Sequence, residues 1–172
     1  SGGLTAGRLV VMLRMLGHPA AVLDGGLRTW DRELDAGWVE PSPADPPFTP
    51  RPWPADRLAT ADETAALAAS RGEGGVVLDA RVAERFTGEV TMIDPRPGHV
   101  PGARNAPWAA VLGTDGRFLP TAELLAHYQR LGATIDPAPI AYCGSGVSAC
   151  MNVLAMEHAG LTPPRLYVAS FS

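Results

Sequence analysis

One cysteine stands in a segment whose residue types suit nucleophilic chemistry. Residues 143–148 read Cys-Gly-Ser-Gly-Val-Ser and directly follow the apolar run 140–142. Glycines let successive backbone N–H groups turn toward one point, and a helix start adds partial positive charge. Both effects favour thiolate over thiol, so we predict that Cys143 is a reactive, low-pKa nucleophile. The hydroxyls of Ser145 and Ser148 can donate to the sulfur or to a bound anion.

The second cysteine has a different setting. Cys150 falls within the apolar stretch that follows the loop, beside Met151 and Val153, where we expect a buried core thiol. Two cysteines in 172 residues do not make a disulfide framework. They fit a reducing compartment, and we expect a cytoplasmic protein.

The overall composition limits the classes of ligand. The net charge is −4 and basic residues form no run, which argues against nucleic-acid binding. No apolar stretch approaches the roughly 20 residues of a membrane span, so no membrane partner is expected. Asp79 and His99 lack metal-ligand spacing, and we expect neither a metal nor a cofactor. A small anionic ligand fits the loop at Cys143 better.

The elements around the loop alternate between strand and helix. Strands are expected at residues 20–23, 76–80, 140–142 and 166–169. Helices are expected at 5–16 after a Thr5 cap, 27–36, 60–70 with a Thr60/Glu63 capping box, 121–131 after a Thr121 cap, and from 147 to about 159. Residues 81–104 read as a loop with a short helical start at 82–86. This α/β order predicts a parallel sheet with helices on both faces, with Cys143 at the carboxyl end of a strand, where ligands bind.

A composition break divides the chain. Seven prolines fall between Pro41 and Pro54, a density that neither a helix nor a central strand tolerates. We therefore expect an extended linker at residues 41–57, between one unit at 1–40 and another at 58–172.

Several ordered motifs together resemble one family. Residues 143–149 are similar to the CGSGVTA active-site loop of two-domain sulfurtransferases of the rhodanese family, mercaptopyruvate type, with Ser148 in place of threonine. Residues 78–81, the pair Arg85-Phe86 and residues 98–105 resemble the segments that precede this loop. Residues 22–27 with Trp30 resemble the end of the inactive first domain, and residues 166–172 the closing LYVGSWSEW. The resemblance covers nearly the whole chain.

The resemblance implies a rhodanese-like fold and a division into units. Residues 1–40 would be the C-terminal part of an inactive N-terminal rhodanese domain, and 58–172 the catalytic C-terminal domain. We expect the chain to be truncated at both ends, because the early strands of the first domain and a short closing tail have no counterpart. The family's acid–base Asp and His from the first domain cannot be placed.

The resemblance also implies an activity. Cys143 would take a sulfane sulfur from 3-mercaptopyruvate or thiosulfate as a persulfide, then pass it to a thiol or cyanide. Arg85 matches the family's substrate arginine, and Arg96 its second arginine after a gap of about two residues. Either could instead be a solvated surface charge. Ser145 would polarise the substrate or only hydrogen-bond the loop. The remaining substrate-binding residues are expected to be Gly144, Gly146, Val147 and Ser148.

Other functions fit the sequence less well. A non-catalytic rhodanese module for docking or sensing is the main alternative, although such modules usually lose the cysteine. A phosphatase would need an arginine six residues after the cysteine, and that position is Ala149. A nucleotide-binding loop would need a Lys-Ser/Thr or GxGxxG ending, which is missing after Gly146. Oligomeric state is not indicated by any motif.

Overall fold

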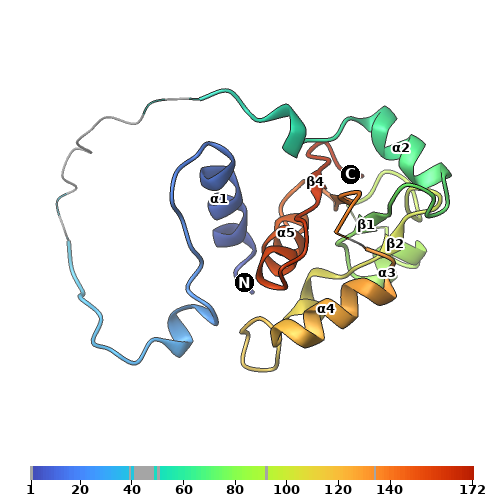
Figure 1. The fold of residues 1–172 in the computed structure, drawn as a ribbon. Coiled ribbons are helices and arrows are strands. Elements are labelled where there is room, and N and C mark those ends of the chain that lie inside the picture. Colours follow the sequence, from blue (N-terminus) through green and yellow to red (C-terminus); the bar gives the residue numbers. More distant parts are fainter. Residues whose placement is uncertain (1, 39, 41–48, 50, 92, 134) are drawn as a thin grey trace.

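Four parallel strands form the centre of the molecule (Figure 1). This computed structural model describes residues 2–38, 40, 49, 51–91, 93–133 and 135–172. Val77 pairs with Ile140 and Asp79 with Tyr142, so the two central strands run in register. In spatial order the strands are β2 (Arg104–Asn105), β1 (Val77–Asp79), β3 (Ile140–Tyr142) and β4 (Arg165–Leu166).

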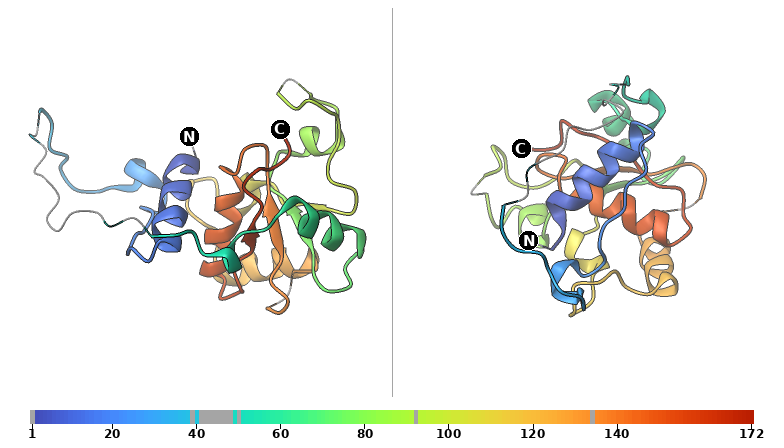
Figure 2. Two further views of the ribbon diagram at one scale, coloured as in Figure 1. Left: turned by 90° about the horizontal axis from the view of Figure 1, so that it is seen from above. Right: turned by 90° about the vertical axis from the view of Figure 1, so that its left-hand side faces the viewer.

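Helices cover both faces of this sheet, as predicted (Figures 1 and 2). Leu78 and Ala141 point to one core and their neighbours Val77 and Tyr142 to another, because side chains alternate along a strand. Among the described residues, the α-helices are α1 (Leu4–Met15), α2 (Ala61–Ala69), α3 (Ala83–Thr87), α4 (Thr121–Arg130) and α5 (Ala149–His158). Three short 3₁₀ helices are η1 (Gly26–Thr29), η2 (Ala55–Arg57) and η3 (Trp108–Val111).

Helix α5 is largely buried and fixes the loop that precedes it. Residues 149–156 are all buried, and the helix contacts α1, α4 and strand β3. Ala, Met and Leu favour helix, and an apolar surface on all sides suits a helix inside a core. Figure 2 shows α1 lying across α5, although the two helices come from opposite ends of the sequence. The loop that carries Cys143 is thus held between β3 and a rigid helix.

The helix and strand boundaries expected between residues 58 and 172 hold closely. Glu63 N–H donates to Thr60 Oγ1 over 3.2 Å, and Thr60 N–H donates to Glu63 Oε2 over 2.8 Å, which completes the predicted capping box. Strand 140–142 and the short helix near 82–86 are also found. Two expectations fail. Thr121 does not cap α4, since Pro120 is the N-cap. Strand β4 ends at Leu166, because the backbone bends at residues 168–169 and reaches a left-handed φ of 58° at Ser170.

The N-terminal unit differs more from expectation. Helix α1 begins at Leu4, with Gly3 rather than Thr5 at the N-cap. Residues 20–23 are extended but form no strand, since no described strand lies beside them to complete a ladder. The helix expected at 27–36 is wrong in length, because only the 3₁₀ helix η1 is found there. Leu34 is 57% exposed, so no packing supports a helix there.

Part of the predicted linker can be placed. Residues 41–48 and 50 lie outside the described residues, and residues 51–54 are extended. Residues 55–57 form η2, so the end of the expected linker is helical rather than extended. Among the described residues, no helix is long and apolar enough to cross a bilayer.

Candidate active site

Cys143 lies where strand β3 ends, held on both sides of its backbone. Its N–H donates to Ser170 Oγ over 3.2 Å, and its carbonyl accepts from Phe171 N–H over 3.0 Å. The segment 167–172 thus continues alongside β3 after β4 has ended. Cys143 is 1% exposed, so a reagent reaches its sulfur only when neighbouring groups move.

Opposing effects act on the Cys143 thiol. Burial raises its pKa, because a thiolate loses solvation in the interior. Hydrogen bonds from the Ser148 hydroxyl, the backbone N–H groups of Ala149 and Ser145, and the Ser170 hydroxyl lower it. The hydrogen bonds together outweigh the effect of burial, so the pKa of Cys143 lies below its ordinary value. Donors from the loop, the start of α5 and the segment 167–172 therefore converge on one sulfur.

Two positions in the loop require glycine, each for a different structural reason. A Cβ at Gly144 would lie 2.7 Å from Arg85 Nη2, so only glycine lets the guanidinium approach the loop this closely. Gly146 has a φ of 72°, and a Cβ there would also lie 3.1 Å from the Val168 carbonyl oxygen. The loop is shaped both for its own turn and for the cation that lies against it.

Arg85 supplies that cation from helix α3. Its Nε and Nη2 donate to the two carboxylate oxygens of Asp94 over 2.7 and 2.5 Å, a bidentate pair. Nη2 also donates to Ser172 Oγ over 3.1 Å. The Arg85 side chain is 20% exposed, which leaves part of the guanidinium open toward a ligand.

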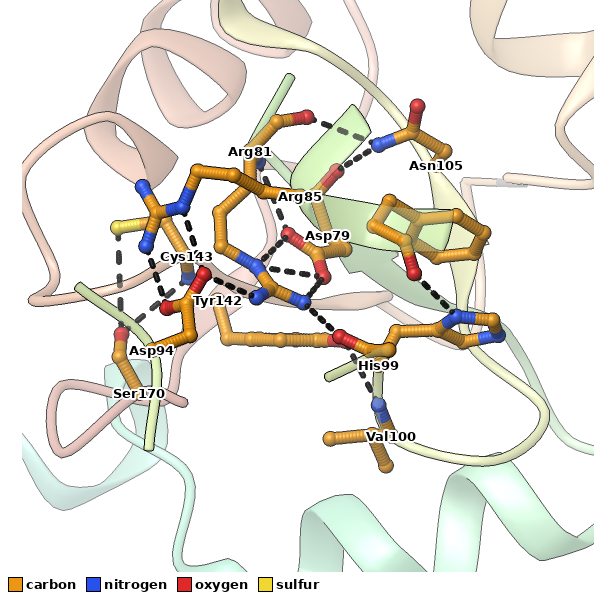
Figure 3. Close-up of polar contacts among 12 residues, drawn as sticks. Asp79, Arg81, Arg85, Asp94, His99, Val100, Asn105, Tyr142, Cys143 and Ser170 are labelled. Carbon is orange, nitrogen blue, oxygen red and sulfur yellow. Dashed lines mark hydrogen bonds and ion pairs between the residues drawn. The ribbon is translucent and has the colours of Figure 1, made fainter. Parts of the chain in front are cut away.

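A buried network of charges supports this arginine (Figure 3). Arg81 Nη2 lies 2.6 Å from Asp79 Oδ2, and Arg81 Nη1 lies 3.2 Å from Asp94 Oδ2. Desolvation lowers the pKa of Arg81. Its hydrogen bonds and ion pairs with these carboxylates raise the pKa by more, so the guanidinium stays charged. Burial raises the pKa of Tyr142, which contacts Asp79. Asp79 therefore holds the Arg81 side chain within this network.

Comparison with known proteins decides the family. The family model described as rhodanese-like domain matches residues 60–172. A curated relative from Pseudomonas aeruginosa, named probable 3-mercaptopyruvate sulfurtransferase, is 43% identical over 99% of this chain and 60% of its own length. The chain belongs to the rhodanese family.

Solved rhodanese structures agree with the fold. The crystal structure of SseA from Escherichia coli, presented with the rhodanese fold of 3-mercaptopyruvate sulfotransferases, matches with a TM-score of 0.79 and 30% identity. The match covers 99% of this chain and 64% of SseA. A structure named as a probable thiosulfate sulfurtransferase matches with a TM-score of 0.64 and 26% identity, over 98% of this chain and 65% of that one. The chain therefore spans less than two thirds of these rhodanese relatives.

The structure brings only some of the predicted site residues together. Cys143, buried Gly144 and Gly146, and half-buried Ser148 form one loop, with Arg85 against it. Val147 is half-buried in the same loop. Ser145 is exposed, and the hydrogen bond it gives Cys143 comes from its backbone N–H rather than its hydroxyl. Arg96 is exposed and forms no ion pair with a described residue.

Three polar residues at the site escaped the sequence interpretation. Ser170 contacts the Cys143 N–H, and Ser172 and Asp94 hold Arg85. Both serines lie in the closing segment that resembles the rhodanese family, where the resemblance was noted but no role assigned. No sequence pattern marked Asp94 as a site residue, apart from its place two residues before Arg96. Its ion pair joins it to Arg85, nine positions earlier in helix α3, and such a pair leaves no local pattern.

Cys150 is buried in the core, as expected, and His99 packs on a neighbouring aromatic ring. Burial raises the pKa of Cys150 to about 12, and its thiol donates to the Gly146 carbonyl over 3.3 Å. It lines an apolar cavity of about 300 Å³ between α1, α5 and β4. His99 stacks on Phe86 with ring centroids 3.6 Å apart. Within the described ranges, no group of three or more acidic, His or Cys side chains is placed to hold a metal.

Proposed function

We propose that this site transfers a sulfane sulfur from 3-mercaptopyruvate or thiosulfate to a thiol or cyanide through a Cys143 persulfide. The observation that carries the proposal is the set of hydrogen-bond donors that lowers the pKa of Cys143, with a cation against the same loop. Relatives named as mercaptopyruvate and thiosulfate sulfurtransferases support it. A thiolate beside an anion-binding group is what attack on an anionic sulfur donor requires.

The chemistry divides into two displacements. In the first, the Cys143 thiolate attacks the outer sulfur of the donor and forms an S–S bond. The bond from that sulfur to the donor breaks, and its electron pair leaves with sulfite from thiosulfate, or with the enolate of pyruvate, which takes up a proton, from mercaptopyruvate. In the second, cyanide or a thiolate attacks the outer sulfur of the persulfide. This gives thiocyanate or a new persulfide, and it regenerates the Cys143 thiolate.

The other predicted residues have supporting roles in this proposal. Arg85 binds the anionic group of the donor, and the backbone N–H groups of the loop stabilise both the thiolate and the persulfide. Its exposed position leaves Arg96 available as a second donor-binding arginine. Ser145 is exposed at the loop surface, where its hydroxyl can reach a bound donor rather than the sulfur.

We further propose the division of the chain into an N-terminal unit, a linker and a catalytic unit. Residues 1–40 would belong to a first rhodanese domain, 41–57 to the linker, and 58–172 to the catalytic domain. The family match begins at residue 60, and relatives align across 99% of the chain, which supports this division. Two free thiols fit a reducing compartment.

Intact mass after incubation with each donor tests the activity. The parent chain and Cys143→Ser are incubated separately with thiosulfate and with 3-mercaptopyruvate. We expect a gain of roughly 32 Da, one sulfur atom, in the parent alone. The donor that gives the faster gain identifies the preferred substrate. No gain from either donor would contradict the proposal for this chain and would favour the docking or sensing module.

A further inference from the structure

The geometry of Arg85 leaves one edge of its guanidinium for a ligand. Asp94 occupies the other edge, accepting from Nε and Nη2 over 2.7 and 2.5 Å. Among the described residues, no hydrogen-bond partner is found for Nη1. Nη2 also donates to the Ser172 hydroxyl, which lies beside Asp94 Oδ1. A carboxylate or sulfonate binds such an edge with two parallel hydrogen bonds.

Asp94 is itself held in a fixed position. Its side chain is 2% exposed, and it accepts a short hydrogen bond from the Ser172 hydroxyl besides its contacts with Arg85 and Arg81. Arg81 is fully buried and donates to Asp79 and to the Gly98 carbonyl over 2.8 Å. Its guanidinium carbon also lies 4.1 Å from the centre of the Phe171 ring. A rigid internal frame therefore fixes the carboxylate that grips Arg85.

Arg85 attracts an anion through its free donor edge rather than through a net charge of the network. The carboxylates of Asp79 and Asp94 balance the two guanidinium groups of Arg81 and Arg85. Hydrogen bonding to Arg85 is the main effect that holds the pKa of Asp94 well below its usual range, against the effect of burial. The carboxylate thus stays ionised at neutral pH and keeps its grip on the guanidinium.

We propose that Asp94 is a positioning residue that aims the Nη1–Nη2 edge of Arg85 at the donor beside the Cys143 loop. The identity of the donor rests on the proposed function. The anion preference of the site does not rest on the proposed function, because it can be measured without turnover. Removal of a negative charge should by simple electrostatics help an anion bind. A positioning role predicts the opposite, since a released Arg85 loses its orientation.

Alkylation of Cys143 by two reagents of similar size measures this preference. Iodoacetate is anionic and iodoacetamide neutral, and thiolate attack on either forms a C–S bond and releases iodide. The ratio of their rate constants reports the pull of Arg85, while limited access to the buried sulfur affects both reagents. We expect Asp94→Asn and Arg85→Ala each to lower the iodoacetate-to-iodoacetamide ratio about tenfold, the scale of one charge-assisted hydrogen bond. The double variant should lower it no further.

The matched control is Glu84→Gln, which removes the same charge from the exposed neighbour of Arg85. We expect its ratio to stay at the parent value or to rise slightly. If Asp94→Asn does not fold, Asp94→Glu takes its place, because it keeps the charge but displaces the carboxylate by a methylene group. An unchanged or higher ratio in whichever of these two variants folds, or an additive effect in the double variant, would overturn the positioning role. Failure of the proposed activity would instead appear as a parent chain that gains no sulfur while its alkylation ratio stays sensitive to Asp94.

Discussion

At the scale of single residues, the two cysteines show how hydrogen bonding divides thiols that are equally buried. Cys143 and Cys150 are each 1% exposed. Burial raises the pKa of both, but several donors point at the first sulfur, whereas the second donates to a carbonyl. The hydrogen bonds thus favour the thiolate of Cys143, whereas Cys150 remains a core thiol.

Ser148→Ala should raise the pKa of Cys143, because the hydroxyl is the largest of the hydrogen bonds that favour the thiolate. A higher pKa means less thiolate at a given pH, so the iodoacetamide rate profile moves to higher pH. We expect a shift of about one pH unit, from the usual strength of a hydrogen bond to a charged group. Ser145→Ala is the control, because Ser145 acts through its backbone N–H. Equal shifts in both variants would argue against the assigned donors.

At the scale of elements, two helices that begin near a threonine start differently. Helix α2 has the reciprocal bonds between Thr60 and Glu63. Helix α4 has Pro120 at its N-cap and no side-chain cap. The difference is visible in sequence, because Leu124 rather than an acidic residue stands three positions after Thr121. A complete capping box predicts a helix start more reliably than a lone threonine.

Thr60→Ala should therefore cost stability that Thr121→Ala does not. Loss of the N-cap side chain leaves the Glu63 N–H without its acceptor, and we expect the free energy of unfolding to fall by about 1 kcal/mol. Thr121→Ala should change it by less than about 0.5 kcal/mol. Urea unfolding followed by circular dichroism measures both. A similar loss in the two variants would mean that the capping box at Thr60 adds no more to the free energy of unfolding than a threonine outside such a box.

At the scale of the whole molecule, α1 is attached to the catalytic unit through α5. Arg14 Nη1 lies 2.6 Å from Glu157 Oε2, and Val10 and Val11 belong to the same core as α5. Beyond α1, large side chains such as Leu27 (67%) and Trp38 (88%) are exposed. Within the N-terminal unit, α1 contributes fully buried residues to this core, and Ala20 and Val22 are partly buried against it.

Val11→Ala should destabilise the chain as a whole. Val11 is 2% exposed, and loss of its buried methyl groups should lower the free energy of unfolding by about 2 kcal/mol. Leu9→Ala is the control on the same helix, since Leu9 is 56% exposed. If α1 folds with the catalytic unit, the loss appears in one unfolding transition seen by both circular dichroism and tryptophan fluorescence. A separate early transition, with the main one unchanged, would show that α1 folds independently.

The local pattern predicted the elements that carry their own signals. Strand 140–142, the Thr60 capping box and the glycine-rich loop after Cys143 follow from apolar runs, side-chain donors and glycines that are close in sequence. The same signals misplaced residues 20–23 and 27–36, because a strand needs a partner and a short helix needs a packed face. Those supports come from other parts of a fold and leave no trace in the segment itself.

By itself, then, the sequence indicated the family and the parallel α/β plan, and it predicted Cys143 as a nucleophile in a loop at a strand end. Only the tertiary structure decided which charges meet there. Asp94 joins Arg85 to Arg81, and Ser170 reaches Cys143 from the far end of the catalytic unit. These contacts depend on how loops cross the carboxyl edge of the sheet, and that path is set by long-range packing rather than by the spacing of residues along the chain.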